Sequence, residues 1–107
     1  MANEPESRRL ILQRTLVELL GSSNVYFQPP NKTMLKYPCF IYRREGTKTL
    51  KADDTNYLKT PRYTLTYITK NPDDVMIDKV LDSFEMIGHD RTFITDNLYH
   101  NVYTLYF

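Results

Sequence analysis

The sequence predicts an α+β fold in one domain, residues 1–107, with two layers: a largely antiparallel sheet of about four to five strands covered by two helices. Three observations predict it. Residues 62–68 alternate aromatic and β-branched side chains at period two, which is typical of a strand. Two segments carry apolar residues at helical spacing. The chain closes on two apolar stretches separated by turn-forming residues.

The first helix is expected from about Pro5 to Leu20. Asn3 is a candidate N-cap, and Gly21 suits a left-handed C-cap. The apolar stripe consists of Leu12, Leu16, Leu19 and Leu20, flanked by Ile11 and Val17. This stripe favours a helix packed on a sheet over a basic helix on a membrane surface, because its apolar face contains no Trp or Phe.

Two short strands are expected at about 24–28 and 39–44. Residues 45–60 are mostly polar, and a compact domain rarely carries so long a segment without a role. We therefore predict a projecting interaction arm over 45–60, in which Thr47 to Lys51 could form a strand of a hairpin, with a disordered surface loop as the alternative. Pro61 is expected to end the arm, so that the central strand begins at Arg62.

The second helix is expected from about Asp74 to Met86, with Asp73 or Asp74 as its cap and Gly88 at its end. Its apolar stripe comprises Val75, Met76 or Ile77, Val80, Leu81 and Phe84.

The two closing strands are expected at about 89–95 and 101–107, joined through the turn-forming pair Asp96-Asn97. The last strand is too apolar to fray. We therefore expect it inside the sheet or in a subunit contact.

Charge is unevenly distributed along a chain whose net charge is +1. Residues 1–51 contain nine basic and four acidic side chains (+5), whereas residues 52–107 contain five basic and nine acidic ones (−4). Either this asymmetry has no consequence on a solvated surface, or the two sides of the protein attract one another between copies.

The residues that metal sites and nucleophilic catalysis require are not grouped in this sequence. His89 and His100 lack metal-ligand spacing, and the one cysteine, Cys39, is predicted to be a small buried hydrophobe. The three glycines form no phosphate-binding loop. We expect no metal and no cofactor. No apolar segment has the length of a membrane span and no secretory signal is evident, so a cytoplasmic origin is expected.

Two other functions stay open. A small metal-dependent nucleotide hydrolase would use Asp53, Asp54 and Asp96. A nucleic-acid-binding module would use a basic group in and before the arm, although neighbouring acids dilute its charge. That group is Arg43, Arg44, Lys48 and Lys51.

Five blocks of the sequence resemble a known family of phage proteins. They are VYFQPP (25–30), YPCFIYRRE (37–45), ADDTNY (52–57), RYTLTYITKNPDD (62–74) and FITDNLYHNVYTLYF (93–107). The family consists of small proteins of bacteriophages and prophages with long non-contractile tails, described as tail terminator, tail completion or tail-to-head joining proteins. The pattern DNLYHNVY is the most distinctive part, and Asn71 departs from the family pattern.

The resemblance implies a structural virion protein without enzymatic activity. Such a protein forms a homo-oligomeric ring, typically a hexamer, that caps the tube of stacked major tail proteins and presents a surface to the head connector. Its partners would be other copies of itself, the tail tube protein, a head-completion or connector protein, and DNA passing through the lumen. It would be located in the tail or neck of the virion after assembly in the host cytoplasm. The alternative within the virion is a head-completion (stopper) protein one ring higher.

From charge alone, we expect contacts between the basic group named above and acidic residues of the next copy. These acidic residues are Asp73, Asp74, Asp78 and Asp82. The arm residues Asp53, Asp54 and Tyr57 are also expected at an inter-subunit or tube contact.

Overall fold

The computed structural model describes residues 7–31, 33–52 and 56–107. The elements are α1 (Arg8–Leu20), β1 (Val25–Phe27), β2 (Cys39–Ala52), β3 (Asn56–Thr69), α2 (Met76–Ser83), β4 (Ile87–Thr95) and β5 (Leu98–Tyr106). The strands form one sheet in the order β1-β2-β3-β5-β4. Only the short β1 pairs in parallel, so the predicted α+β fold with a largely antiparallel sheet is confirmed.

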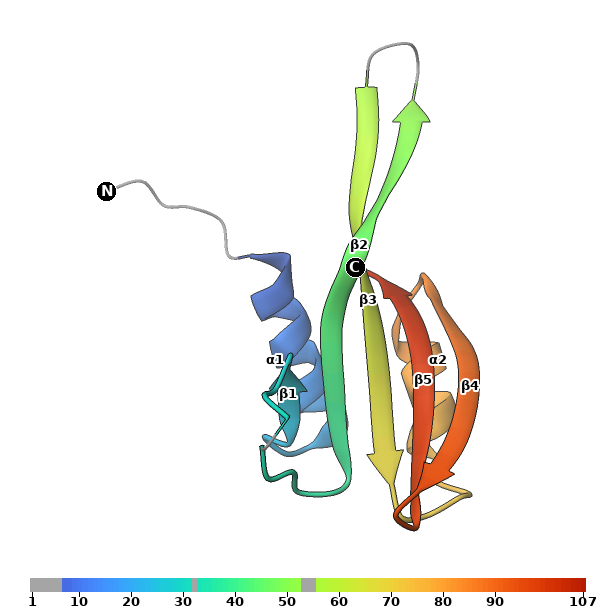
Figure 1. Ribbon diagram of the computed structural model, residues 1–107. Helices are drawn as coiled ribbons and strands as arrows, with labels where there is room; N and C mark the ends of the chain where they lie inside the picture. Colours follow the sequence, from blue (N-terminus) through green and yellow to red (C-terminus); the bar gives the residue numbers. More distant parts are fainter. Residues whose placement is uncertain (1–6, 32, 53–55) are drawn as a thin grey trace, which may run out of the picture.

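Both helices pack on the same face of the sheet, with α1 beside β1 and α2 beside β4 (Figure 1). Leu12 and Leu16 of α1 and Val80 of α2 join one buried cluster with side chains from that face. The sheet contributes Val25, Phe40, Tyr42, Tyr63, Leu65, Tyr67, Tyr103 and Leu105. The predicted alternation in the central strand is confirmed, because its three core residues are buried at every second position.

The closing strands pair around a two-residue turn. Asp96 and Asn97 both have positive φ, 53° and 61°, as a type I′ hairpin turn requires. The turn joins Thr95 to Leu98. β5 lies between β3 and β4, which confirms that the last strand is inside the sheet. Both strands begin two or three residues earlier than predicted.

The arm is a regular β-hairpin. β2 and β3 pair from Gly46↔Arg62 to Ala52↔Asn56, and a β-bulge between Arg44 and Gly46 marks its base. Figure 1 shows this hairpin projecting beyond the rest of the sheet. We use "the arm" for residues 46–52 of β2 and 56–61 of β3. The prediction of a projecting arm is confirmed.

The prediction that Pro61 separates the arm from the central strand is wrong, because β3 runs through it. The Phe107 N–H donates to the Pro61 carbonyl at 3.2 Å. The N–H and C=O of a strand residue point to the same side, so the Pro61 nitrogen faces the side of β5. On that side, the pairing between β3 and β5 ends at Arg62↔Tyr106. Because the Pro61 nitrogen points away from β2, its missing N–H removes no donor from the β2–β3 ladder.

The first helix begins later than predicted. Ser7 is its N-cap, and the Ser7 Oγ accepts a hydrogen bond from the Leu10 N–H at 3.2 Å. The predicted cap, Asn3, and the predicted first-turn Pro5 lie outside the described residues. Gly21 ends the helix with φ 77°, as predicted.

The second helix is shorter than predicted at both ends. It runs over Met76–Ser83, and Gly88 belongs to β4 instead of ending the helix. Val75, which was placed in the apolar stripe, is 81% exposed because it precedes the first helical turn. Val80 is fully buried, so the centre of the predicted stripe is confirmed.

Candidate assembly interface

In the folded protein, the basic and the acidic segments of the sequence lie near the two opposite lateral edges of the sheet. α1 contains three arginines and one glutamate, and it lies on the β1–β2 side. Residues 73–85, which include α2, contain five acidic residues and one lysine, and α2 lies on the β5–β4 side (Figure 1). The basic and the acidic helix therefore occupy opposite lateral sides of the molecule.

The first turn of α1 is held to the sheet through its arginines. The Arg8 guanidinium lies 4.7 Å from the centre of the Phe107 ring, and its Nε donates to the Phe107 carbonyl. The Arg9 guanidinium lies 4.5 Å from the centre of the Phe27 ring. Cation–π contacts of this kind fix the position of the positive charge as well as adding stability. Two basic side chains are thereby placed near the base of the arm.

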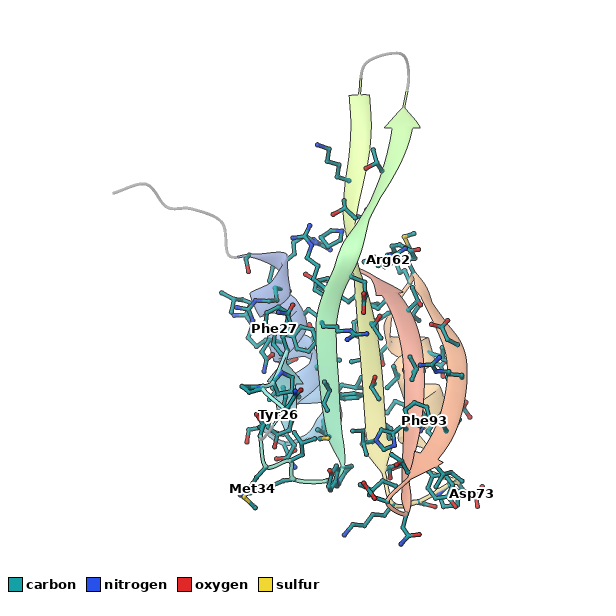
Figure 2. The ribbon with its side chains drawn as sticks, in the orientation of Figure 1. Tyr26, Phe27, Met34, Arg62, Asp73 and Phe93 are labelled. Carbon is teal, nitrogen blue, oxygen red and sulfur yellow. The ribbon has the colours of Figure 1, made fainter. Side chains whose placement is uncertain are left out.

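More basic side chains surround the base of the arm. Arg44 donates to the Thr47 Oγ1 at 3.0 Å, across the bulge. The Arg62 guanidinium lies against Gly46, 3.4 Å from where a Cβ would stand there. Figure 2 shows Arg62 at this base. Sequence reasoning missed Arg8, Arg9 and Arg62, because only the fold brings the start of α1 to the arm.

A recess of about 570 Å³ lies between the base of the arm, the start of α1 and the end of α2. Phe84 and Phe107 meet there edge to face, with ring centres 6.1 Å apart. The lining residues are Arg8, Lys59, Thr60, Pro61, Ser83, Phe84, Glu85, Met86, Tyr106 and Phe107. Apolar rings combined with two basic side chains and one carboxylate suit a contact with protein.

The predicted basic residues are brought together on the arm and at its base. Arg43 and Arg44 are exposed on β2, and Arg43 forms an ion pair with Glu45. Lys48 and Lys51 belong to the β2 strand of the arm. Tyr57, also predicted at the contact, belongs to the β3 strand of the arm. The predicted Asp53 and Asp54 lie outside the described residues.

The predicted acidic residues fall into two groups. Asp73, Asp78 and Asp82 are exposed on or beside α2. Figure 2 shows Asp73 at the end of the sheet opposite Arg62, so a single chain does not bring Asp73 to the base of the arm. Asp74 differs, because its carboxylate is half-buried and engaged inside the protein.

Asp74 joins β3 to the start of α2. Its Oδ2 accepts hydrogen bonds from the Tyr67 hydroxyl at 2.6 Å and from the Thr69 hydroxyl at 2.8 Å. Its Oδ1 accepts one from the Met76 N–H at 2.9 Å, as a helix cap does. The sequence predicted Asp74 both as a cap and as a contact residue. With both oxygens engaged internally, we retain only the cap.

Burial by itself would raise the pKa of Asp74. Hydrogen bonds from Tyr67, the Met76 amide and Thr69 outweigh burial and lower this pKa below its ordinary value. The carboxylate is therefore ionised at neutral pH. Burial, followed by the hydrogen bond to Asp74, raises the pKa of Tyr67. The pair is a structural anchor.

β4 is the outer strand on the side of α2, and residues 88–95 are all exposed. A bulge between His89 and Arg91 interrupts its first half. The second half is regular and carries two large exposed apolar side chains, Phe93 (40%) and Ile94 (62%). Long apolar edge strands are sites where another chain pairs. Sequence reasoning missed this site, because the position of a strand at the edge depends on the order of the whole sheet.

Of the three residues proposed for a nucleotide hydrolase, the structure describes only Asp96. Asp96 occupies the β4–β5 turn, at the end of the sheet opposite the arm (Figure 1). Asp53 and Asp54 are outside the described residues. Within the described ranges, no three His, Cys, Asp or Glu side chains are grouped as a metal ion would need.

Cys39 is fully buried, and burial raises the pKa of its thiol to about 12. The thiol is therefore protonated at neutral pH, and the prediction of a small buried hydrophobe is confirmed. Among the helices in the described part of the chain, none has both the length and the apolar character needed to cross a membrane.

No known protein family matches the chain, and no curated protein has a similar sequence. The resemblance to tail proteins thus stays a prediction. The separated charges, the arm and the free strand edge carry the functional argument.

Proposed function

We propose that the protein is a structural component of a long-tailed bacteriophage: a tail terminator or tail completion protein, not an enzyme. It forms a ring, expected to be a hexamer, that caps the tail tube and joins it to the head connector. The observation that carries this proposal is that the basic helix and the acidic helix, which share one face of the sheet, lie near its two opposite lateral edges.

Opposite charges on opposite sides favour a head-to-tail contact between identical copies. A two-fold contact through either side would bring like charges together, which is unfavourable. A head-to-tail contact leaves one free basic side and one free acidic side on every open chain of copies. Closure into a ring satisfies both, and a ring is the form that a cap on a tube requires.

The projecting arm also supports a function in an assembly. An isolated two-stranded ribbon is marginally stable in water, and the arm extends beyond the strands that flank its base. Contact with a neighbouring copy or with the tube would stabilise it. We propose that Arg43, Arg44, Lys48 and Lys51 of one copy face Asp73, Asp78 and Asp82 of the next.

Polymerisation of the tail tube protein in the presence of this protein tests the function. The expected result is tubes capped at one end, with the protein sedimenting with them at a small, fixed ratio to tube subunits. Protein that stays in the supernatant at every concentration contradicts the proposal. A reconstruction of the virion neck then decides between the end of the tube and the stopper position one ring higher.

A further inference from the structure

Along the arm, one edge of β2 is not paired with any of the described strands. β1 pairs only with Phe40–Tyr42, and the Arg44 N–H is occupied by the Gln28 side chain at 3.4 Å. From Gly46 to Ala52, β2 has β3 on one side and no described strand on the other. A strand with a free row of N–H and C=O groups is a template for another strand.

The free edge of β4 is its counterpart at the other side of the sheet. Its regular part is Arg91–Thr95, which is exposed throughout. A two-residue turn closes on a hydrogen-bonded pair, so Thr95 directs its N–H and C=O toward Leu98. Ile94, one residue earlier, directs its N–H and C=O away from β5, toward the free edge. This outward edge has neither a proline nor a lysine to block pairing.

These two edges lie on the sides that carry opposite charge. The free edge of β2 faces the side of β1 and the basic α1, whereas β4 is on the side of the acidic α2. β2 and β4 run in opposite directions within the sheet. We propose that Gly46–Ala52 of one copy pairs in antiparallel fashion with Arg91–Thr95 of the next, which makes the sheets of neighbouring copies continuous.

Charge at one end of this pairing supports it. The antiparallel pairing places the base of the arm, with Arg44, against the end of the neighbour that carries the Asp96–Asn97 turn. Thr69↔Tyr99 pairing brings the segment that contains Asp73 to that same end.

A single chain cannot make this pairing with itself. β4 starts near the base of the arm at Ile87↔Leu105 and runs away from it (Figure 1). The arm projects in the opposite direction. Pairing with the arm therefore displaces each neighbouring copy along the strand direction. A ring can close with this displacement only when the strands are inclined to the ring axis, as they are in closed barrels.

The inference rests on the association of copies that the proposed function requires, and cysteine cross-linking tests it separately. Thr49→Cys in the arm and Ile94→Cys in β4 place thiols at exposed positions of the two edges. The native Cys39 is fully buried, so the unchanged chain is the background control. A short bis-maleimide spans direct and diagonal cross-strand neighbours, which are about 5–8 Å apart.

The two single variants are mixed and treated with the cross-linker. We expect dimers that contain one chain of each variant, and no dimers when either variant is treated alone. The double variant should give a ladder of linked chains up to the ring size. The matched control, Thr49→Cys with Ser22→Cys, carries the same number of exposed thiols and should give no ladder.

A ring of normal mass without these cross-links overturns the pairing and leaves the proposed function standing. Cross-links in Thr49→Cys alone also overturn it, because they show arm-to-arm contact. Cross-linked rings that never join a tail tube uphold the pairing and contradict the proposed function.

Ile94→Pro gives a second test without cross-linking. Proline there removes an outward amide and no bond of the β4–β5 ladder, so the fold should persist with an unchanged thermal transition. We expect the ring to be lost. Ile94→Val, which keeps the amide and the apolar side chain, should assemble normally. A ring that survives Ile94→Pro contradicts the pairing.

Discussion

The hydroxyl of Tyr67 donates a 2.6 Å hydrogen bond to the Asp74 carboxylate, and this contact fastens the central strand to the start of α2. Thr69 and the Met76 amide donate to the same carboxylate. Asp74 therefore holds the acidic helix at its place on the sheet. The charge separation on which assembly depends rests in part on this internal anchor.

Asp74→Ala should destabilise the fold. It leaves two hydroxyls and a helix N–H without their shared acceptor, and such losses cost about 1–3 kcal/mol in the free energy of unfolding. Urea denaturation followed by circular dichroism measures this. The neighbouring exposed Asp73→Ala is the control and should change stability little. Equal stability of Asp74→Ala and the native protein would contradict the anchoring role.

Acid should weaken the same anchor. The pKa of Asp74 in the folded protein is lowered from its ordinary value of 3.8. Its contribution to stability is then fully present above pH about 4 and is lost as pH falls through the lowered pKa. The difference in unfolding free energy between the native protein and Asp74→Ala should therefore be large at pH 7 and shrink below pH 4. A difference that is the same at pH 7 and pH 3 would be inconsistent with this.

Reversing charge on α2 should weaken association between copies. Asp78→Lys combined with Asp82→Lys replaces attraction with repulsion at exposed positions, and we expect an about tenfold rise in the dissociation constant, measured by analytical ultracentrifugation. Adding Arg43→Glu and Arg44→Glu to the same chain should restore assembly. If assembly returns, the residues form a charge contact and the first two changes did not simply damage α2. If assembly does not return, these residues are not in contact between copies.

Removing the arm should abolish the ring and spare the fold. A chain in which Asn-Gly replaces residues 47–61 joins Gly46 to Arg62 by a two-residue turn. Among the residues whose burial the structure describes, the core cluster includes none from the arm, so the thermal transition should change little. We expect a folded monomer by light scattering. A ring formed without the arm would show that the arm is not needed for assembly.

The alternating strands were predictable because burial on one face forces period two in residues such as Tyr63 and Leu65. The hairpin turn at Asp96 was predictable from its chemistry. The regular pairing of the arm was predictable only as a possible strand at 47–51, because the mostly polar residues of this segment lack that alternation. Pro61 misled the prediction, since its tolerance depends on where β5 ends.

The candidate interface was predictable only in its charges. The sequence identifies Arg44 and Asp78 as members of basic and acidic segments. It does not show that the two segments lie on opposite sides of the sheet. The exposed edge at Ile94 was not predictable, because it results from β5 inserting between β3 and β4. Asp74 was predicted as a contact residue as well as a helix cap, because the sequence does not show its internal partners Tyr67 and Thr69, which come from β3.

Native mass spectrometry of the full chain, over a range of concentrations, tests the head-to-tail assembly most directly. We expect one closed species of fixed subunit number, six for a hexamer, that dissociates when salt screens the charges between copies. A monomer at every concentration, or a dimer that grows no further, would contradict it.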